Sequence, residues 1–365
     1  MKPIILLGEA FGTNEEKLGV GFVGAAGVEL LRMLNEAGAL SLSSVDQDYI
    51  SRYYRESKPE LLDMVWKLHP EFHRTNVFQL HPPGNRIEAF CGPKTEGITG
   101  YPALVKGKFV RREFKSELER LGDELVKLDP NLVVCFGNSA LWALCGTTGI
   151  SKLRGTTAVS THTASGFKCL ATYHPAAVLR QWELRPVTII DLMKASREAS
   201  YPEIRRPKRE IWIEPTLEDI HDYYKRYLKN ATRVSIDIET SGQQITCIGF
   251  AQSGGGALVV PFFDPRKPGR SYWTTRQDEE SAWAFVRNVC EDKQIQKTLQ
   301  NGLYDIAFLY RSVGIKVLGA AEDTMLLHHA LQPEALKGLG FLGSVYTDEG
   351  SWKGMRKTET IKRDE

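Results

Sequence analysis

Hydrophobic and polar residues along the first half of the chain form short blocks that predict strands and helices in turn. Apolar runs at residues 3–7, 132–136 and 168–172 end in glycine or polar residues, as buried parallel strands do, and residues 77–78 lie in a similar stretch. Because strands and helices alternate, we expect a mostly parallel sheet covered by helices on both faces. The helices are expected at residues 24–34, 114–128 and 139–144.

The second half of the chain has a different pattern. A stretch rich in proline and charge at residues 201–210 has little periodicity, so we expect a linker there. Residues 1–200 and 211–365 would then be two domains, as expected for 365 residues. The elements expected after the linker indicate a mixed α/β domain: a helix at 217–228, strands at 234–238, 245–252 and 257–263, and a helix around 282–289.

Composition limits the class of protein but does not identify it. The formal net charge is only +2, so affinity for nucleic acid would have to come from local patches of lysine and arginine. There is no signal peptide and no apolar run of about 18 residues, so we expect a cytoplasmic protein without a membrane partner. Six scattered cysteines without a Cys-x-x-Cys pair are expected to be reduced core residues.

Side chains suited to a flat, polar ring follow several of the predicted strands. A turn at Gly8 would let the backbone approach such a ligand closely. Phe22 could stack on a base, and Asn76 carries both a donor and an acceptor for a pyrimidine edge. His174 could donate to a carbonyl that gains negative charge, and carboxylates nearby in sequence could polarise water. A single Asn or His is more often structural, so it is the combination at strand ends that indicates a site.

Several motifs in the first 195 residues carry a family resemblance. Residues 8–27 read GEAFGTNEEKLGVGFVGAAG, residues 75–77 read TNV, residues 82–86 read PPGNR and residues 173–180 read YHPAAVLR. In this order and spacing they resemble the iron–sulfur type of uracil-DNA glycosylase. The resemblance implies an α/β/α sandwich that extrudes deoxyuridine from DNA and cleaves its N-glycosidic bond.

The resemblance also implies roles for individual residues. Phe22 would stack on uracil, Asn76 would read its edge, and His174 would stabilise the uracil anion at O2. The pocket would be lined by Gly8, Ala10 and Phe11 with the backbone of Glu9, and Glu9 or Glu15 would assist the attacking water. Pro175, Ala176, Leu179 and Arg180 would enter the gap left by the flipped nucleotide or approach its phosphates.

The chain departs from this family pattern in three places. It begins too close to its first motif to carry the family's N-terminal cysteine pair, and Leu80 stands where a motif cysteine is usual. We therefore expect no iron–sulfur cluster and no cofactor for the glycosylase. Phe11 replaces the usual proline beside the pocket, which makes activity on uracil an expectation that needs a test.

A second set of polar residues lies in the last third of the chain. Asp237 and Glu239 alternate on a predicted strand, so they share a face, and Asp305 follows in a predicted helix. Carboxylates placed this way suit a pair of Mg²⁺ or Mn²⁺ ions about 4 Å apart. The segments VSIDIETSG at 234–242, QNGLYDIAFL at 300–309 and EDTMLLHHALQPE at 322–334 resemble the 3′→5′ exonuclease domain of A-family DNA polymerases, including phage ones.

This second resemblance is incomplete. The family's third motif, Tyr-x-x-x-Asp, is absent, because neither Asp348 nor Asp364 has a tyrosine or histidine four or five residues before it. The domain is expected to be truncated after a stretch at 336–352 that resembles the approach to this motif. Asp323 matches a recurrent family aspartate. With one metal site poorly held, we expect weak or no exonuclease activity from this chain alone, unless a polymerase partner completes it.

The preferred hypothesis is a phage-like protein that removes uracil from DNA beside a replication and proofreading module. Two alternatives remain. In one, the exonuclease is active and the glycosylase fold only grips DNA. In the other, both folds are non-catalytic and form a uracil-reading accessory of a polymerase. If the protein is encoded by a phage, it would act in the cytoplasm of the host bacterium.

Overall fold

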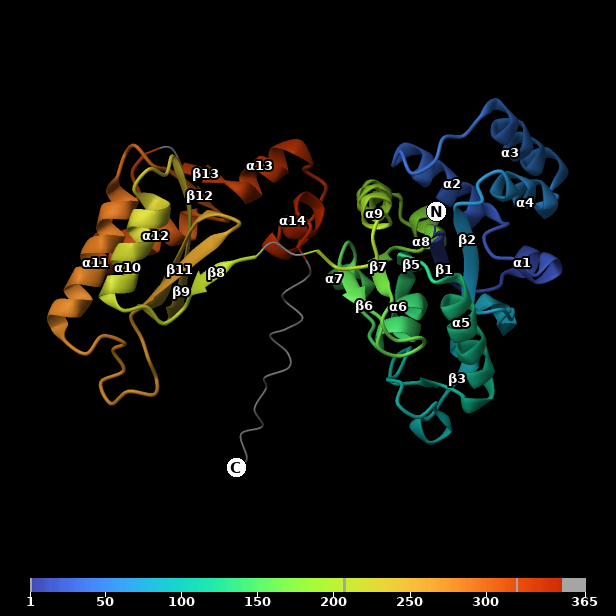
Figure 1. Cartoon of the computed structure of the whole chain (residues 1–365), viewed down its shortest axis with the longest axis horizontal. Helices are drawn as coiled ribbons and strands as arrows, with labels where there is room; N and C mark the ends of the chain where they lie inside the picture. The colour runs from blue at the N-terminus through green and yellow to red at the C-terminus, as the bar shows by residue number, and fades with distance from the viewer. Residues whose placement is uncertain (1, 206–207, 320, 350–365) are drawn as a thin grey trace. The chain divides into compact units, whose positions relative to one another are not determined.

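The computed structural model describes residues 2–205, 208–319 and 321–349, whose contacts divide them into two units (Figure 1). The first unit runs to Ile204 and resumes at Gly340, and the second runs from Arg205 to Leu339. The expected linker thus lies across this division, although residues 206 and 207 are outside the described part. Sequence patterns placed residues 340–349 in the second domain, whereas their contacts are with the first unit.

The first unit is built on a five-stranded sheet in the order β2-β1-β5-β7-β6. Its first four strands in that order are parallel, and the edge strand β6 is antiparallel to β7. The expected mostly parallel sheet is therefore confirmed, with strand positions close to those the apolar runs indicated. The strands are β1 (Ile4–Ala10), β2 (Phe72–Phe78), β5 (Leu132–Phe136), β6 (Thr157–Val159) and β7 (Lys168–Thr172).

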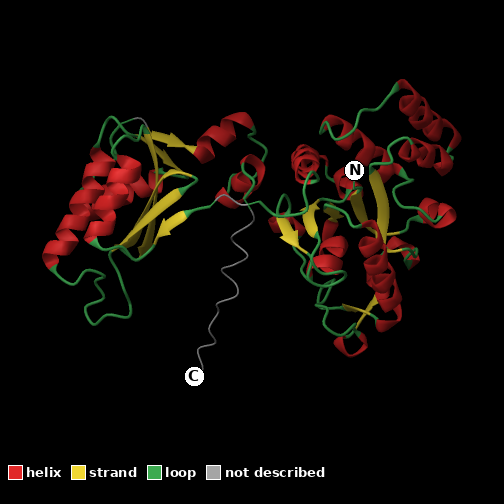
Figure 2. Cartoon of the chain, in the orientation of Figure 1, coloured by secondary structure: helices red, strands yellow, loops and turns green. Residues whose placement is uncertain are grey.

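Helices cover both faces of this sheet (Figure 2). Successive residues of a strand point to opposite faces, so each face presents apolar side chains on which helices pack. On β1, Leu6 packs in one apolar cluster, while Ile5 and Leu7 pack in the other. The first cluster includes residues of α2 (Ala25–Glu36), α3 (Ser44–Glu56), α4 (Pro59–Lys67), α8 (Pro175–Arg180) and α9 (Arg185–Glu198). The second includes residues of α5 (Lys115–Leu128) and α6 (Gly137–Cys145).

Shorter elements complete the first unit. Helix α1 (Thr13–Leu18) follows β1 directly, and α7 (Ile150–Leu153) precedes β6. A small hairpin of β3 (Cys91–Gly92) and β4 (Phe109–Val110) lies in the long connection between β2 and α5. Helix α14 (Leu339–Tyr346) begins at the last residue of the second unit, and its other residues belong to the first.

The second unit contains a six-stranded sheet in the order β13-β12-β9-β10-β11-β8. The three central strands β9 (Arg233–Ser241), β10 (Gln244–Ser253) and β11 (Gly256–Pro261) form an antiparallel meander, as expected. The outer strands β8 (Glu210–Trp212), β12 (Gln296–Leu299) and β13 (Ala321–Asp323) pair in parallel with their neighbours. The mixed α/β fold predicted for this part is confirmed.

The helices of the second unit are α10 (Leu217–Tyr223), α11 (Arg276–Glu291), α12 (Leu303–Val313) and α13 (Thr324–Leu331). The helix expected at 217–228 is α-helical only to Tyr223 and ends in a π-helical turn at Tyr224–Leu228. A separate apolar core lies between this sheet and its helices. Among the described residues, no helix is both long and apolar enough to cross a membrane.

Candidate functional site

The ends of β1 and β2 bring two of the predicted site residues together. Gly8 and Asn76 are direct partners across the two parallel strands. A Cβ atom at Gly8 would collide with Oδ1 of Asn76 and would lie 3.1 Å from Cζ of Phe22. Only glycine therefore fits at position 8 while both side chains keep their places. The Asn76 side chain is buried, at 4% exposure, beside the backbone of the first motif.

The backbone at Asn76 is held by an arginine that the sequence patterns did not single out. Nη2 of Arg120, on α5, donates to the carbonyl oxygens of Asn76 at 2.7 Å and Val77 at 3.2 Å. Its Nη1 donates to Glu124 at 2.7 Å, four residues along the same helix. In sequence this Arg–Glu spacing is typical of an ordinary surface pair. The sequence pattern gives no sign that Arg120 also binds the backbone of β2, so this contact could be found only from the structure.

The loop that carries Phe22 is fixed from three sides. Phe22 has a positive φ of 57°, which is uncommon for an aromatic residue. Nε1 of Trp66 donates to the Phe22 carbonyl at 3.0 Å, and Nη1 of Arg74 donates to the Gly21 carbonyl at 3.0 Å. A side chain at Gly27 would collide with that same Phe22 carbonyl. The strained loop is thus held by surrounding groups, as a preorganised site requires.

His174 lies at the N-terminus of α8, and its contacts set its protonation state. Its Nδ1 accepts a hydrogen bond from the backbone N–H of Ala176 at 3.1 Å. Burial, together with the positive charge of Arg180, lowers the pKa of His174 to about 4. The neutral ring therefore carries its proton on Nε2, because Nδ1 is already an acceptor. Nε2–H is then a neutral donor, as stabilisation of a developing anion requires.

Phe22 and His174 are in direct contact with each other. Their ring centroids are 5.8 Å apart with an interplanar angle of 25°, and Phe136 meets the Phe22 ring edge-on at 5.6 Å. This spacing is that of a directly packed aromatic pair, so there is no room for a third ring between them. Phe22 is only 3% exposed. In this conformation the Phe22 ring covers one face of the His174 ring, and the His174 ring covers one face of Phe22.

The two candidate carboxylates for water activation have different surroundings. Glu9, at the end of β1, accepts a hydrogen bond from Oγ of Ser139 at the start of α6. Burial raises the pKa of Glu9 above its usual value, opposed by the Ser139 hydrogen bond. Glu15 is on α1, and its carboxylate fills the space beside Gly12. A Cβ atom added at Gly12 would lie 2.6 Å from Oε2 of Glu15. Ser139 was not expected from the sequence.

The other residues predicted to line the pocket are next to Glu9 in the sequence. Ala10, the last residue of β1, is half-buried, and Phe11 is buried at 4% exposure. The N–H of Phe11 donates to the carbonyl of Leu80 at 3.2 Å, which joins the first motif to the loop after β2. Leu80 itself is 41% exposed. This backbone contact links the two segments at the position where the family has a cysteine.

The segment after His174 presents several exposed side chains. Pro175 is buried and Ala176 half-buried, whereas Leu179 is 47% exposed and Arg180 is exposed. Trp182, just beyond the motif, is 59% exposed, the most of any tryptophan in the described part of the chain. Trp182 follows the YHPAAVLR motif by two positions, and this aromatic residue could have been singled out from the sequence.

The Trp182 ring packs against the guanidinium group of Arg185. The guanidinium carbon of Arg185 lies 4.9 Å from its ring centroid. Arg185 is itself held by carboxylates, with Nε donating to Glu29 and Nη1 to Glu36, both at 2.7 Å. The indole is therefore exposed but oriented.

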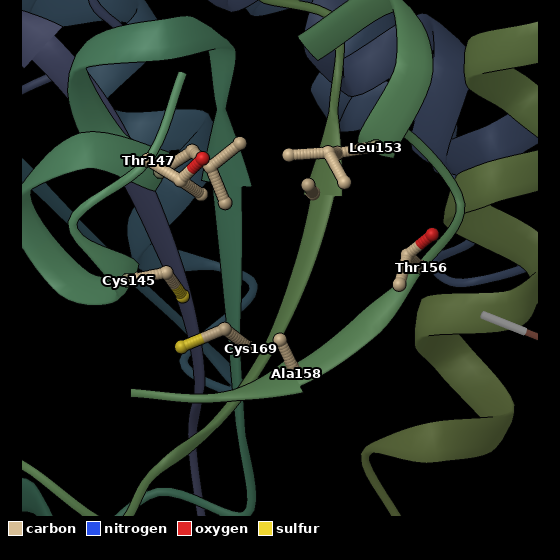
Figure 3. A pocket seen from close by; sticks show the side chains of 8 residues that line it. Cys145, Thr147, Leu153, Thr156, Ala158 and Cys169 are labelled. Carbon is tan, nitrogen blue, oxygen red and sulfur yellow. The ribbon is translucent and has the colours of Figure 1, made fainter. Parts of the chain in front are cut away.

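A small cavity of about 70 Å³ also lies in the first unit (Figure 3). Its lining is apolar, and none of its residues belongs to the predicted base site. The thiols of Cys145 and Cys169 both face it. The pKa of Cys145 is raised, first by its hydrogen bond with Cys169 and then by burial, so this thiol is a poor nucleophile. The cavity is a packing defect with no chemistry of its own.

The carboxylates of the second unit are arranged differently. Asp237 and Glu239 alternate with buried residues on β9, so both are exposed on one face, as predicted. Asp305, on α12, is buried at 6% exposure, and its Oδ1 accepts from the backbone N–H of Ile238 at 3.0 Å. Burial raises the pKa of Asp305, and the charges of Asp323 and Glu239 raise it further.

These carboxylates do not form a metal site in the structure. Within residues 2–205, 208–319 and 321–349, no group of three His, Cys, Asp or Glu side chains is placed to hold a metal ion. Asp323 instead caps α13 and accepts from the N–H groups of Asn301 and Gly302 at 3.1 and 2.7 Å. Asp348 pairs with Arg197 of the first unit, and Asp364 lies outside the described residues. Among the described residues, the carboxylates of the second unit are therefore of the type that binds divalent ions but are not gathered into a group of three donors.

Solved structures of nucleases resemble part of the chain. An RNase D from Trypanosoma brucei in complex with RNA covers 42% of this chain and 52% of its own, at 15% identity and a TM-score of 0.33. The Nibbler EXO domain of Aedes aegypti covers 45% of this chain and 80% of its own, at 14% identity and a TM-score of 0.33. At these scores neither carries an argument about function.

Sequence relatives cover both units. A DNA polymerase of Bacillus phage SP01 is 27% identical over 262 residues, which are 63% of this chain but only 27% of that polymerase. The chain thus spans about a quarter of that relative's length. A type-4 uracil-DNA glycosylase of Archaeoglobus fulgidus is 30% identical over 192 residues, 50% of this chain and 69% of the relative.

Family profiles match the two parts of the chain separately. Residues 213–363 match the profile of a 3′-5′ exonuclease, which confirms the predicted nature of the second part. Residues 1–196, more than half of the chain, match the profile of the uracil DNA glycosylase superfamily. Together with the glycosylase relatives, this match confirms the resemblance in the first motifs. The chain therefore belongs to the uracil DNA glycosylase superfamily and also carries a 3′-5′ exonuclease domain.

Proposed function

We propose that the first unit removes uracil from DNA by hydrolysing the bond between the base and its deoxyribose. The observation that carries this proposal is the neutral His174, whose Nδ1 accepts from the Ala176 N–H and leaves Nε2–H as a donor. A donor that stays neutral can bind uracil and its departing anion without a charge that must be solvated. Asn76 and Gly8, partners on adjacent strands, supply the neighbouring recognition surface.

In this proposal Asn76 reads the base. Its carbonyl oxygen accepts from N3–H of uracil and its amide nitrogen donates to O4, a pair of bonds that cytosine would reverse. Arg120 keeps the Asn76 backbone in place by binding its carbonyl oxygen. Phe22 stacks on the uracil ring. Since Phe22 now packs against His174, entry of the base must separate these two rings.

The chemistry follows from these positions. The C1′–N1 bond breaks, and its electron pair passes to uracil, where Nε2–H of His174 donates to the negative O2. The sugar becomes an oxocarbenium ion, and a water oxygen forms the new bond to C1′. Its proton passes to a carboxylate, either Glu9 or Glu15. Glu9 has the raised pKa of a proton acceptor suited to this step, which favours it.

Contacts with DNA are assigned to the exposed segment after His174. Leu179 would fill the gap left by the flipped nucleotide, and Arg180 would approach a phosphate, while Pro175 and Ala176 shape the turn. Both Leu179 and Arg180 are exposed, as such contacts require. Trp182 extends the same exposed segment and offers a stacking surface for a base.

The second unit is assigned a supporting role. We infer that its exonuclease domain has weak or no activity in this chain, because the Tyr-x-x-x-Asp motif that would complete Asp237, Glu239 and Asp305 is absent from these 365 residues. The similarity to a phage DNA polymerase supports coupling of uracil removal to replication, with a polymerase as partner and the bacterial cytoplasm as the place of action.

The proposal is tested with a labelled oligonucleotide that contains one uracil, incubated in EDTA and then treated with alkali. The wild-type chain is expected to produce a break at the uracil, whereas Asn76→Ala and His174→Ala are expected to reduce it by about 10² to 10³-fold. EDTA excludes any metal-dependent nuclease. Glu9→Gln and Glu15→Gln, assayed in parallel, identify the carboxylate that accepts the proton.

Other outcomes would favour the alternatives. Binding of uracil DNA without cleavage would point to a reader that lacks catalysis. Digestion from the 3′ end that requires Mg²⁺ and is lost in Asp237→Ala would assign the activity to the second unit. The first result would contradict the proposed excision, and the second would contradict the inference that the exonuclease domain has weak or no activity.

A further inference from the structure

Residues 340–349 lie within the stretch that matches the exonuclease profile, yet they belong to the first unit and make specific contacts there. Nη1 of Arg154 donates to Oγ of Ser344 at 2.8 Å, and its guanidinium lies 5.6 Å from the centroid of the Phe341 ring. Nζ of Lys194 donates to the carbonyl of Thr347 at 3.4 Å. Residues 340–349, called here the return segment, are thus seated over the loop that contains Arg154.

The neighbouring Gly155 is shaped to fit this arrangement. It has a positive φ of 70°, and a Cβ atom there would lie 2.8 Å from Oδ1 of Asp191 and 3.2 Å from the carbonyl of Ser344. A side chain would therefore strike both the buried aspartate and the return segment. This close approach gives a physical reason for glycine at position 155.

Arg154 and Asp191 form a buried ion pair that needs the return segment to be complete. Their side chains are 2% and 0% exposed. Nε and Nη2 of Arg154 both donate to the Asp191 carboxylate, and Nη1 donates to Ser344. A buried guanidinium must have its donors satisfied, since a buried donor without a partner is unfavourable. Ser344 supplies the partner for the nitrogen that the aspartate does not reach.

The same ion pair is connected to the strand that leads to His174. Oδ2 of Asp191 accepts from Oγ1 of Thr172 at 2.7 Å, and Thr172 is the last residue of β7. His174 follows two residues later and begins α8. A chain of hydrogen bonds thus runs from Ser344 through Arg154 and Asp191 to the end of β7.

We propose that the return segment is a working part of the glycosylase. Ser344 completes the Arg154–Asp191 pair, and this pair holds the end of β7 and thereby positions His174. Ser344, Arg154 and Asp191 are positioning residues, because none of them belongs to the base site itself. The kinetic part of this inference rests on the proposed uracil excision, whereas its structural part does not. A chain cut at residue 200 would lack this positioning contact.

The first test measures hydrogen–deuterium exchange on the full chain carrying Ser344→Leu or the milder Ser344→Ala. Loss of the hydroxyl leaves a buried donor of Arg154 without its partner, so amides at residues 153–156 and 168–174 are expected to exchange about tenfold faster. Asp348→Ala is the matched control on the same segment. Its ion pair with Arg197 is exposed at 63% and 61%, so it is expected to leave exchange unchanged.

The second test separates positioning from general stability. Uracil excision by Ser344→Ala is expected to show a reduced kcat with an unchanged KM, because His174 is displaced while Leu179 and Arg180 keep their DNA contacts. Ser344→Thr, which keeps the hydroxyl, is expected to restore kcat. A thermal unfolding measurement of each variant shows whether the protein remains folded at the assay temperature.

Two results would overturn the proposal. Unchanged exchange at 168–174 in both Ser344→Leu and Ser344→Ala would show that the return segment does not hold β7. Faster exchange with an unaltered kcat would show that β7 does not transmit the change to His174. If the wild-type chain excises no uracil at all, the proposed function fails, while the exchange result still decides whether the segment holds the strand.

Discussion

The proposed base site of the first unit and the carboxylates of the second differ in how far the polypeptide alone assembles them. In the first unit, Asn76, Phe22 and His174 are buried or half-buried and held by hydrogen bonds to their backbone or rings. In the second, Asp237 and Glu239 are exposed, and no metal-binding group is formed among the described residues. Neutral groups can pack together, whereas carboxylates that converge without a cation repel one another.

The difference appears again in the protonation states. Burial lowers the pKa of His174 to about 4, and the neutral form that results is the one that the proposed uracil site uses. Burial and neighbouring charges raise the pKa of Asp305, which disfavours the ionised form that a metal site needs. The protonation state of a site for a neutral base can therefore be set by folding, while a cluster of metal ligands depends on its ion.

The largest expected effect comes from breaking the preorganised site at Gly8. In Gly8→Ala the new methyl group would collide with the Asn76 side chain, so uracil excision should fall by about 100-fold or more through misplacement of this side chain. Gly122→Ala is the matched control, because its Cβ would lie 3.8 Å from the nearest atom, in ordinary contact. Comparable excision by Gly8→Ala and the wild type would contradict the close packing described for this site.

The sequence predicted one part of this comparison well. Apolar runs marked β5 and β7 to the residue, and the residues proposed from motif resemblance, Gly8, Phe22, Asn76 and His174, are neighbours in the structure. Both signals are local, because each depends on neighbours within one element or motif.

The supports of that site were not predictable in the same way. Arg120 donates to the carbonyl of Asn76, and Trp66 donates to the carbonyl of Phe22. In each case the two residues are 44 positions apart in the sequence. A hydrogen bond to a backbone oxygen leaves no periodic pattern in the sequence, since every residue carries such an acceptor. The contacts of residues 340–349 with the first unit could not be predicted from the sequence either. Ser344 and Arg154, which are joined by a hydrogen bond, are 190 positions apart.

The next prediction concerns the pH dependence of stability. The pKa of His174 is about 4 in the folded protein, compared with 6.5 as its ordinary value, so between these values the unfolded chain binds more protons. The free energy of unfolding should therefore rise as pH increases from 4 to 6.5, by roughly 3 kcal/mol from this residue. Urea denaturation at several pH values measures it.

His174→Gln is the control for this titration, because it removes the ring and leaves the other groups in place. The difference in pH dependence between wild type and variant isolates His174 from Glu9, whose raised pKa acts in the opposite direction. Parallel stability curves for the two proteins would show that His174 titrates normally and that the base site is not preorganised in the neutral form.

A smaller effect is expected at Trp182. Its exposed ring is oriented by Arg185, and stacking of a base on an aromatic ring contributes about 1–3 kcal/mol. Trp182→Ala should weaken binding of a DNA duplex with a non-cleavable uridine analogue accordingly, and Trp182→Phe should weaken it less. Fluorescence anisotropy measures both. Tyr54→Ala removes another exposed aromatic ring, at 54% exposure, and is expected to have no effect. Equal affinities for all four proteins would exclude a stacking role.

The smallest expected effect is that of Mg²⁺ on the second unit. An assembled site would stabilise this unit by about 2.7 kcal/mol when Mg²⁺ is present at about 100 times its dissociation constant. Because no group of three donors is in place among the described residues, we expect no such stabilisation and no Mg²⁺-dependent digestion of single-stranded DNA. Thermal unfolding with Mg²⁺ and with EDTA measures the first, and a 3′-labelled oligonucleotide measures the second. If Mg²⁺ stabilised the wild type but not Asp237→Ala, the carboxylates of the second unit would assemble around the ion, and the two sites would differ only in what completes them.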